Sequence, residues 1–358
     1  MSKYSAEERA ILWLCACTKT EYRERTMLLR AAPSPVALFA EPERFFPKVC
    51  KERAKDAYHS KQERRQQEAD AFLEKLERKG YFAVTLISDD YPEPLKHISL
   101  PPLVLFGAGK RELLAKRKFC IVGSRITPPW AEKLGRTISA ELAGQFAIVT
   151  GLAEGGDLAA IEGAMSEGSL ICVLPCGLDE CYPAAHASLK EKVKGQGLLL
   201  SELLPWETAK KYSFHARNRI LAGISEGVLI LSAAQRSGAL ITANCALDFG
   251  RDVFALPHNV GTAHGEGCNE LLKKGAFVTT GAEDILSAYG MKRREVKLPP
   301  LTPEEARVLG VLREGGELHT AVIAERAGLK VFEVSALLSA LEIKGVAVKS
   351  GGNKYCAV

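Results

Sequence analysis

The sequence predicts an α/β protein whose centre is a doubly wound, mostly parallel sheet, preceded by a helical domain and followed by a winged helix. The chain has 358 residues, of which 47% are apolar, so it can bury the cores of two or three domains. Aromatic residues make up only 7%, whereas glycine occurs 31 times, a balance that favours α/β folds with many tight turns. From Phe82 onward, short apolar runs alternate with longer amphipathic stretches, as in βαβ units.

Residues 1–80 are expected to form an N-terminal helical domain. Apolar clusters around Ile11 and Leu28 precede a turn-forming segment at residues 33–35, and further apolar residues follow it. Residues 51–79 then interleave basic and acidic side chains at helical spacings. Such a run is typical of a solvated helix face, and a direct contact with DNA is the alternative interpretation.

Residues 81–290 are expected to form the α/β domain. Its candidate strands are rich in Val, Ile and Leu without polar alternation, which indicates burial on both faces of the sheet. The candidate strands are Phe82–Ile87, Phe119–Val122, Ala147–Val149, Leu170–Leu174, Leu198–Leu200, Val228–Leu231, Val253–Ala255 and Phe277–Thr279. The candidate helices are Trp130–Gly144, Asp157–Gly168, Ala184–Lys194, Phe214–Gly223, Ala239–Gly250 and Glu266–Lys274.

The C-terminal part of the chain is predicted to form a linker and a small third domain. Residues 291–300 are charged and then proline-bearing, which is typical of a linker. The segment Thr302–Glu305 holds a capping-box pair, with proline at the first helical position, and therefore begins a helix. Two helices and a Gly-Gly hairpin follow, at Thr320–Ala327, Val331–Lys344 and Val346–Val358. This order predicts a winged helix over residues 301–358.

Charge and cysteine content narrow the functional class. The formal net charge of +5 permits nucleic-acid binding without requiring it. The ten cysteines form no C-x-x-C pair, and Cys172, Cys176 and Cys181 have no suitably spaced histidine, so we expect reduced thiols, no metal and no cofactor. The N-terminus lacks a signal-peptide pattern, and no apolar run approaches the length of a membrane span. We therefore expect a cytoplasmic protein that does not enter a membrane.

Four sets of glycine and polar residues follow predicted strands where helices begin. They are Gly123-Ser124-Arg125, the segment from Gly151 to Asp157, the segment 210–219, and Arg236-Ser237-Gly238-Ala239. The carboxyl ends of parallel strands share one edge of a sheet, where glycine admits a ligand to the backbone and helix N-termini attract anions. Segment 210–219 combines lysines, arginines and aromatic residues, which suits phosphate contacts and base stacking together.

Each of these sets also has an ordinary structural interpretation. Gly123 suits any βα turn, and the G-x-G-x-x-G pattern of dinucleotide-binding proteins is missing. Asp157 can simply cap a helix, and segment 210–219 can be a surface helix whose arginines pair locally. Catalysis finds little support, because the seven histidines show no partner pattern and no nucleophile elbow occurs.

Taken together, the motifs resemble those of the DNA-processing protein A family, also called DprA or Smf. The resemblance runs in one order through residues 89–286, so no single motif carries it. The matching segments are DDYPEPLKHISLPPLVLFGAG (89–109), VGSR (122–125), TGLAEGGD (150–157), VLPCGLDECYP (173–183), SELLP (201–205), FHARNRILAGIS (214–225), SGALITA (237–243), GRDVFALP (250–257) and GAFVTTGAEDIL (275–286). The N-terminal helices and the winged helix also stand where many family members carry a helix-hairpin-like domain and a winged helix.

The resemblance implies a bacterial, non-catalytic protein that binds single-stranded DNA in an extended Rossmann-like domain. It also implies that the protein loads the RecA recombinase onto this DNA during natural transformation. Carried over by motif, the expected DNA contacts are Gly123, Ser124, Arg125, Lys211, Phe214, Arg217, Asn218 and Arg219. The residues expected to shape the pocket are Gly151, Asp157, Ser237 and Gly238. One departure is Glu154, which stands where the family usually has a basic residue.

The family dimerises through the late part of this domain, which implies a homodimer interface around Leu247, Leu271 and Val278. For DNA binding we expect glycine-turn amides and the guanidinium groups of Arg125, Arg217 and Arg219 to hold phosphates. Phe214 or Tyr212 would stack a base.

Other functions stay open at this point. One is a nucleotide or nucleotide-sugar hydrolase of the lysine-decarboxylase-like Rossmann group, although the P-G-G-x-G-T-x-x-E string of that group does not occur here. Another is a transcription regulator that reads duplex DNA through residues 301–358. The candidate recognition helix Val331–Lys344 has few side chains able to read base edges, which favours a protein-docking or accessory role.

Overall fold

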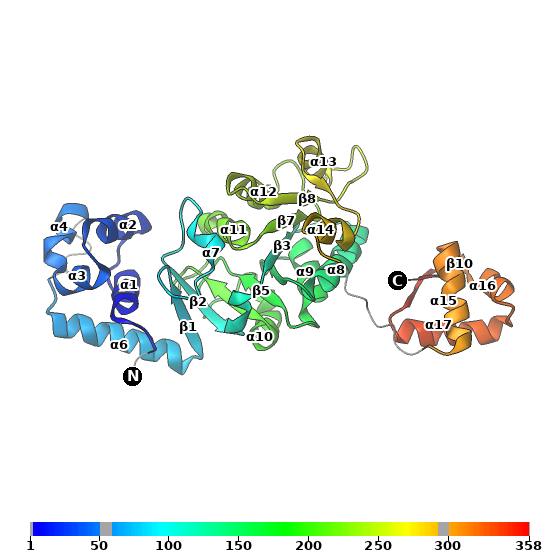
Figure 1. Cartoon of the computed structure of the whole chain (residues 1–358), viewed down its shortest axis with the longest axis horizontal. Helices are drawn as coiled ribbons and strands as arrows, with labels where there is room; N and C mark the ends of the chain where they lie inside the picture. Colours follow the sequence, from blue (N-terminus) through cyan, green and yellow to red (C-terminus); the bar gives the residue numbers. More distant parts are fainter. Residues whose placement is uncertain (1–2, 51–58, 293–300, 358) are drawn as a thin grey trace. The chain divides into compact units, whose positions relative to one another are not determined.

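A sheet of nine strands forms the centre of the larger compact unit in the computed structural model, which describes residues 3–50, 59–292 and 301–357. The two compact units comprise residues 1–293 and 294–358. The strand order in the large sheet is β1-β2-β6-β5-β4-β3-β7-β8-β9 (Figure 1). The strands are β1 (Tyr81–Thr85), β2 (Val104–Gly109), β3 (Lys118–Val122), β4 (Ala147–Thr150), β5 (Leu170–Val173), β6 (Leu198–Ser201), β7 (Gly227–Ile230), β8 (Asp252–Ala255) and β9 (Phe277–Val278).

The sheet is doubly wound and mostly parallel, as the sequence predicts. In the sheet order from β6 through β5, β4, β3, β7 and β8 to β9, every neighbouring pair runs parallel. Strand β2 pairs antiparallel with both β1 and β6. Strand β3 lies between β4 and β7, so the chain winds outward from β3 in both directions. In open α/β sheets, ligands bind at the carboxyl edge where the winding direction reverses. Here that position is the shared end of β3 and β7.

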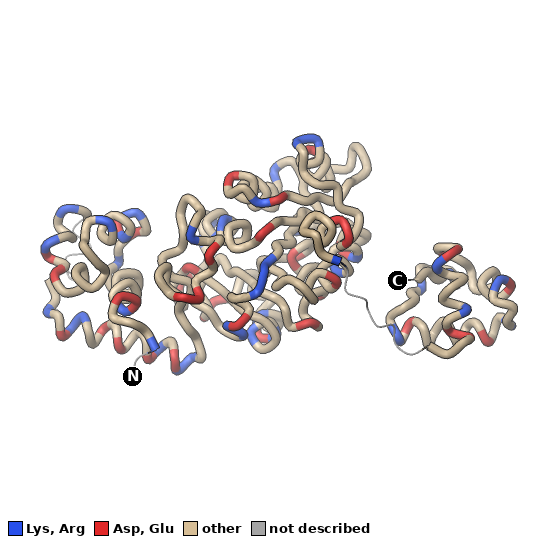
Figure 2. The backbone as a smooth tube through the Cα atoms, viewed as in Figure 1, with Lys and Arg blue, Asp and Glu red and all other residues tan. Residues whose placement is uncertain are grey.

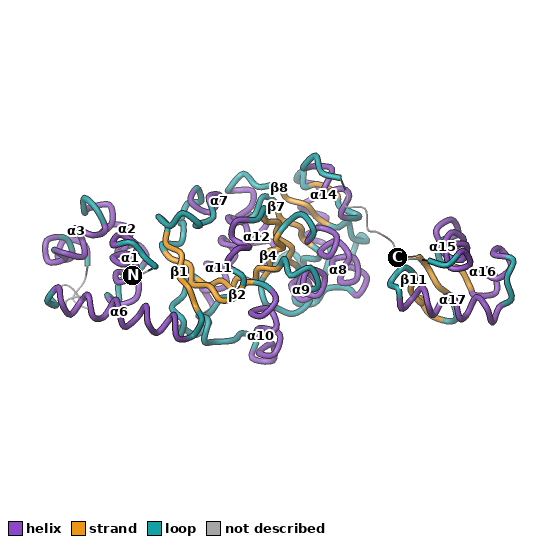
Figure 3. The backbone as a smooth tube through the Cα atoms, turned by 60° about the horizontal axis from the view of Figure 1, so that its bottom comes forward, coloured by secondary structure: helices purple, strands orange, loops and turns teal. Residues whose placement is uncertain are grey.

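Helices cover both faces of the parallel strands (Figure 3). Helices α8, α9 and α14 pack on one face, and α11, α12 and α13 pack on the other. Their bounds are α8 (Pro129–Ala143), α9 (Gly156–Met165), α11 (Lys211–Ile224), α12 (Gly238–Asp248), α13 (Glu266–Lys273) and α14 (Ala282–Ala288). The remaining helices of this region are α7 (Glu93–Lys96), η3 (Arg111–Ala115), η4 (Ala184–His186) and α10 (Ala187–Gln196).

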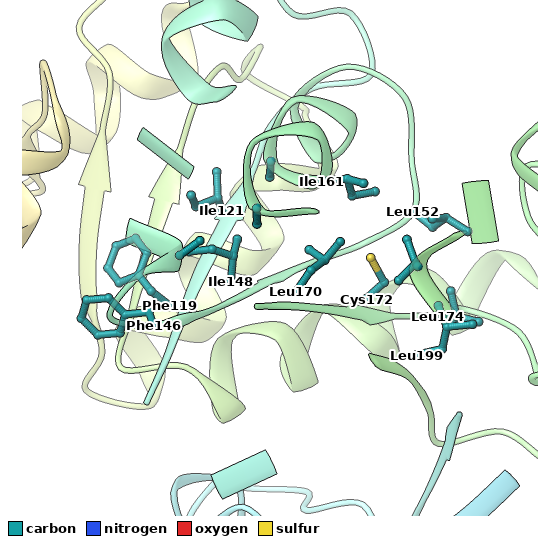
Figure 4. Packing of buried hydrophobic residues seen from close by; sticks show 14 of the residues in the cluster. Phe119, Ile121, Phe146, Ile148, Leu152, Ile161, Leu170, Cys172, Leu174 and Leu199 are labelled. Carbon is teal, nitrogen blue, oxygen red and sulfur yellow. The ribbon is translucent and has the colours of Figure 1, made fainter. Parts of the chain in front are cut away.

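The apolar core is divided between the two faces of the sheet by the two-residue period of the strands. Phe119 and Ile121 of β3 point to the face shown in Figure 4, where they pack near Ile148 of β4. The intervening Cys120 and Val122 belong to the core on the opposite face. Both faces are apolar because both are covered, and each fully buried large side chain contributes about 1.5–3 kcal/mol.

The N-terminal helices pack against the β1 end of the sheet. They are α1 (Ala6–Cys17), α2 (Tyr22–Ala31), α3 (Pro35–Ala40), η1 (Pro42–Arg44), α4 (Phe46–Val49) and α6 (Gln62–Arg78). Ser5 and Glu8 form a capping box at the start of α1. Helix α1 buries Ile11 and Leu12 in the core beside the sheet and Trp13 and Leu14 in a separate helical core.

Helix α6 carries the described part of the charged run predicted as a solvated helix face. It buries Arg65, Ala69, Phe72 and Leu76, which follow a helical spacing along one stripe. Charges of both signs alternate along the rest of the helix (Figure 2). Residues 51–58 of the run lie outside the described residues.

The second compact unit is a winged helix, as the sequence predicts. Its elements are α15 (Pro303–Gly315), β10 (Leu318–His319), α16 (Thr320–Ala327), α17 (Val331–Ile343), β11 (Ala347–Gly351) and β12 (Lys354–Ala357). The expected capping box joins Thr302 and Glu305. The Glu305 carboxylate also accepts a hydrogen bond of 2.6 Å from Lys344 Nζ, which ties α15 to the end of α17. The hairpin turn has positive φ angles at Gly352 and Asn353.

Strand β2 is the main element that the sequence interpretation misses. Its run Val104–Gly109 contains two glycines, which weaken a strand signal. Gly107 is required because a Cβ there would lie 2.2 Å from the Phe82 ring on β1. The predicted domain division at residues 80 and 290 stays a prediction, and most of the predicted linker 291–300 lies outside the described residues.

Candidate nucleic-acid interface

A cavity of about 780 Å³ opens at the carboxyl ends of β3 and β7. Residues from all four predicted sets line it, so the fold brings the sets together at one edge of the sheet. We call it the basic cavity and define it by its lining residues: Val122, Gly123, Ser124, Arg125, Ile126, Ala153, Asp157, Tyr182, Ala209, Lys210, Lys211, Phe214, His215, Arg217, Asn218, Leu221, Ala234, Arg236, Ser237, Gly238, Ala239, Ile241 and Thr242.

The turn after β3 is held by backbone bonds that leave the Arg125 side chain exposed. The Ser124 amide donates to the Ser232 carbonyl at 2.9 Å, and the Ser124 carbonyl accepts from the Gly156 amide at 3.1 Å. Gly155 has a φ of +68°, and a Cβ there would lie 2.3 Å from the Ser124 carbonyl oxygen. The amides of Ser124 and Gly156 are thus already bonded within the protein. These two amides are therefore not available to a phosphate, and phosphate contacts by other amides of the glycine turns stay a prediction.

An arginine and two aromatic rings form a cluster on the wall of the basic cavity. The Arg125 guanidinium carbon lies 5.8 Å from the ring centroids of both Tyr182 and Phe214. The two rings contact each other edge to face at 4.9 Å between centroids. Our sequence interpretation did not single out Tyr182, although it lies in the quoted segment 173–183, because a tyrosine in a loop gives no signal of its spatial neighbours.

Positive charge dominates the lining of the basic cavity. Among the described residues that line it, the cations are Arg125, Lys210, Lys211, Arg217 and Arg236, and the carboxylate is Asp157. Helices α11 and α12 both begin at the cavity, so their positive dipole ends also face it. Glu154, the departure from the family pattern, is exposed and lies outside the lining. A site of this charge favours an anionic ligand.

Arg217 and Asn218 form the buried floor of the cavity and support its shape. Arg217 donates from Nη1 to the Val173 carbonyl at 2.6 Å and from Nε to Asn218 Oδ1 at 3.0 Å. Asn218 Nδ2 donates to the Gly238 carbonyl at 3.2 Å, so the network joins β5, α11 and the start of α12. Burial lowers the pKa of Arg217, while Asp157 opposes that shift.

Asp157 and Gly151 complete this floor. Asp157 is buried, and its Oδ2 accepts from the Ala153 amide at 3.3 Å. Burial raises the pKa of the Asp157 carboxyl, and the nearby Arg217 charge partly opposes the rise. A Cβ on Gly151 would lie 2.3 Å from Asp157 Oδ2 and 2.4 Å from Arg217 Nη1. Glycine is therefore needed at position 151 for these two groups to occupy their places.

Ser237 and Gly238 stand at the first turn of α12. The Ser237 hydroxyl accepts from the Ala239 amide at 3.3 Å and so caps its own helix. Both residues line the basic cavity, as does His215, an exposed side chain that the sequence interpretation left aside.

Arg219 lies apart from the other predicted DNA contacts. Its Nη2 donates to the Glu202 carboxylate at 2.6 Å, and its Nη1 donates to the Leu100 carbonyl. It does not line the basic cavity. Arg217 and Arg219 stand two residues apart on α11 and therefore project to different sides of the helix. Arg217 reaches the cavity floor, while Arg219 forms a local ion pair. A contact between Arg219 and DNA stays a prediction that this geometry does not favour.

The residues expected at a dimer interface gather near the far edge of the sheet. Leu247 of α12 and Val278 of β9 are exposed, whereas Leu271 of α13 is buried. Leu247 and Leu271 line a small cavity of about 160 Å³ next to Phe277. Strand β9 ends the strand order of the sheet.

No group of three or more His, Cys, Asp or Glu side chains in residues 3–50, 59–292 and 301–357 is placed to hold a metal ion. No helix in the same part of the chain is long and apolar enough to cross a membrane.

Comparisons with known proteins agree with this architecture. A family model described as DNA recombination-mediator protein A matches residues 82–290, and another described as the DprA winged helix domain matches residues 292–353. Protein Smf of Escherichia coli (strain K12) is 36% identical over 299 residues, which cover 77% of this chain and 78% of that protein.

Two solved structures are also similar. The X-ray structure of DNA processing protein A from Streptococcus pneumoniae aligns with a TM-score of 0.67 and 32% identity, over 80% of this chain and 98% of that one. DNA processing protein A from Helicobacter pylori, whose structure is described as giving insights into its unique single-stranded DNA binding mode, aligns with a TM-score of 0.53 and 31% identity. This alignment covers 58% of this chain and 95% of that one.

Proposed function

Since this chain belongs to the DNA recombination-mediator protein A family, also called DprA or Smf, we propose that it binds single-stranded DNA in the basic cavity without catalysing a reaction. The observation that carries the proposal is the cluster of Arg125 with Tyr182 and Phe214, beside the exposed lysines at the start of α11. Guanidinium and ammonium groups neutralise phosphates, and aromatic rings stack on bases.

The cavity suits an unpaired strand better than a duplex. The bases of a duplex stack on one another, so their faces cannot reach Phe214 or Tyr182. An unpaired strand offers both its phosphates and its base faces, and stacking contributes about 1–3 kcal/mol per base whatever the sequence. Binding should therefore be selective for single strands and indifferent to sequence. The Helicobacter relative, described by its single-stranded DNA binding mode, supports this proposal.

The test compares fluorescence anisotropy for a labelled single strand and for its duplex at two ionic strengths. We expect the single strand to bind at least about tenfold more tightly, which corresponds to stacking of one or two bases. Its affinity should fall with salt with a log–log slope of about −3, since the exposed cations Arg125, Lys210, Lys211 and Arg236 would release about 0.7 counterions each. Equal affinity for strand and duplex would overturn the proposal.

A homodimer is part of the proposal. The exposed Leu247 and Val278, together with the outer strand β9, offer an apolar surface and a sheet edge that a second copy can cover. Leu271 lies beneath this surface and would support it. Light scattering of the chain and of its Leu247→Asp variant tests this, because a buried aspartate at the interface would favour the monomer.

Loading of RecA during natural transformation is the last part of the proposal and rests on the family resemblance. The measurement is RecA filament assembly on single strands already coated with single-strand-binding protein, with and without this protein. Faster assembly supports the role, and an unchanged rate counts against it.

A further inference from the structure

A second, smaller cavity lies next to the basic cavity, and of its lining residues only Lys210 and Tyr212 are among the DNA contacts expected above. It has a volume of about 180 Å³ and is lined by Leu203, Trp206, Glu207, Thr208, Lys210, Tyr212 and Ser213. Lys210 lines both cavities, so the two lie next to each other at that residue. We call this second cavity the aromatic groove.

Two exposed aromatic residues of the groove remain unused by the basic cavity. Tyr212 is 65% exposed and Trp206 is 42% exposed. Tyr212 and Phe214 stand two residues apart in the first turns of α11, so they project to different sides of that helix. Phe214 therefore faces the basic cavity while Tyr212 faces the groove.

Each aromatic residue of the groove has a lysine beside it. Lys210 Nζ lies 5.9 Å from the ring centroid of Tyr212, and Lys75 Nζ lies 4.3 Å from the ring centroid of Trp206. The acidic side chain in the lining, Glu207, is engaged locally because its Oε2 accepts from the Leu204 amide at 2.7 Å. Alternating rings and ammonium groups match the alternating bases and phosphates of a single strand.

We propose that the aromatic groove binds a further nucleotide of a single strand that leaves the basic cavity past Lys210, with its base against Tyr212 or Trp206 and its phosphate near Lys210 or Lys75. This inference rests on the proposed function, because the strand must first occupy the basic cavity. Lys210 is common to both cavities, and a lysine stands beside each ring of the groove, which argues for DNA as the occupant rather than a protein segment. The groove would thus lengthen the site without adding sequence preference.

The test measures the affinity of the full chain for oligothymidylates of two lengths, about 6 and about 20 nucleotides, which span the usual site sizes of single-strand-binding folds. Tyr212→Ala should weaken binding of the longer strand about tenfold, the value of one lost stacking contact, and change the shorter strand less than about twofold. Trp206→Ala should act in the same direction. Tyr212→Phe keeps the ring and should restore the wild-type affinity.

Phe332→Ala is the matched control, because Phe332 is 69% exposed and lies in the other compact unit. It should leave both affinities unchanged. If Tyr212→Ala alters neither length, or weakens both equally, the groove does not bind DNA and the inference is wrong. If the wild-type chain binds neither oligonucleotide, the proposed function itself fails, which is a different result from a variant that binds like wild type.

Discussion

The basic cavity and the exposed face of α17 both present aromatic and aliphatic side chains to solvent, yet their charge differs. The cavity surrounds its aromatic residues with lysines and arginines. Helix α17 exposes Val331, Phe332 and Ile343; one lysine, Lys330, lies 5.9 Å from the Phe332 ring centroid, and the acidic residues within the helix are Glu333 and Glu342. An exposed aromatic ring therefore does not by itself indicate a nucleic-acid site, because phosphates must be neutralised nearby.

The backbone of the two regions differs in the same sense. The cavity lies where two helices begin, so positive dipole ends face its interior. Val331 and Phe332 of α17 also stand in a first turn, but there the Glu333 carboxylate accepts from the Lys330 amide at 2.8 Å and offsets the helix dipole. Lys344 follows this helix and pairs with Glu305, so it does not extend the face with a free charge. The comparison supports the proposal that DNA binds in the cavity, and it favours a protein-docking or accessory role for α17.

The largest expected effect would come from removing two cavity cations. Arg125→Ala combined with Lys211→Ala should lower single-strand affinity about 100-fold, since each charged phosphate contact contributes roughly 1.5–3 kcal/mol. The slope of log affinity against log salt concentration should also become shallower by about 1.4, at about 0.7 for each lost phosphate contact. Anisotropy titrations at several salt concentrations measure both quantities.

The matched control for this variant removes two exposed lysines from the winged helix, Lys330→Ala with Lys349→Ala. It has the same change in net charge, so its affinity and salt slope should stay within about twofold of wild type if only local charge acts. If both double variants lose single-strand affinity to a similar extent, the basic cavity does not differ from the winged helix in DNA binding.

A smaller effect is expected from crowding the cavity floor. Gly151→Ala places a methyl group against Asp157 Oδ2 and Arg217 Nη1, so the free energy of unfolding should fall by about 2 kcal/mol. Single-strand affinity should fall with it, because the floor orients Asn218 and the start of α12. Chemical unfolding followed by circular dichroism provides the measurement.

Gly238→Ala is the matched control for this effect. A Cβ at position 238 would meet nothing within 4 Å. The free energy of unfolding should therefore change by less than about 0.5 kcal/mol. If Gly151→Ala is as stable as wild type, the cavity floor adjusts to the added methyl group without a loss of stability. The basic cavity would then be less rigid than the comparison with the exposed face of α17 assumes.

The smallest expected effect is a pH dependence of binding. Burial raises the pKa of Asp157, so its carboxyl takes up a proton at higher pH than an ordinary aspartate. As pH falls, the loss of this negative charge beneath the cavity should strengthen single-strand binding. Asp157→Asn should bind about fivefold more tightly at pH 7, the value of about 1 kcal/mol for one charge at partly screened distance. It should also flatten the pH profile.

The pH profile is also measured in a His215→Asn background, because His215 lines the same cavity. The part of the profile that remains there belongs to Asp157. If Asp157→Asn binds as wild type at every pH, the buried carboxylate does not act on the DNA.

Much of the fold follows from local pattern. Uninterrupted apolar runs such as Leu170–Val173 identify buried parallel strands, and the Thr302 capping box marks the start of α15. Strand β2 was not predicted in this way, because Gly107 accommodates Phe82 on a neighbouring strand and Gly109 lies against backbone carbonyls of Lys194 and Gly197. A pattern of single residues cannot report a cross-strand partner.

The candidate site divides in the same way. The sequence places Arg125, Lys211 and Phe214 at a shared edge, because strand ends and helix starts are local features. It does not separate Arg217, which forms the floor, from Arg219, which pairs with Glu202 outside the cavity. The two are alike in sequence, and only the packing around α11 distinguishes them.

The sequence by itself determined most of the strands and helices, though not β2, together with the positions of the glycine turns and the family to which the chain is similar. These features depend on periodicity and on residues close together in the chain. Tertiary structure alone decided which cations face the cavity and which rings meet, as with Tyr182 and Phe214. It also decided that the groove beside Tyr212 shares Lys210 with the cavity. Such contacts join residues far apart in the chain, and their geometry is set by how the layers pack.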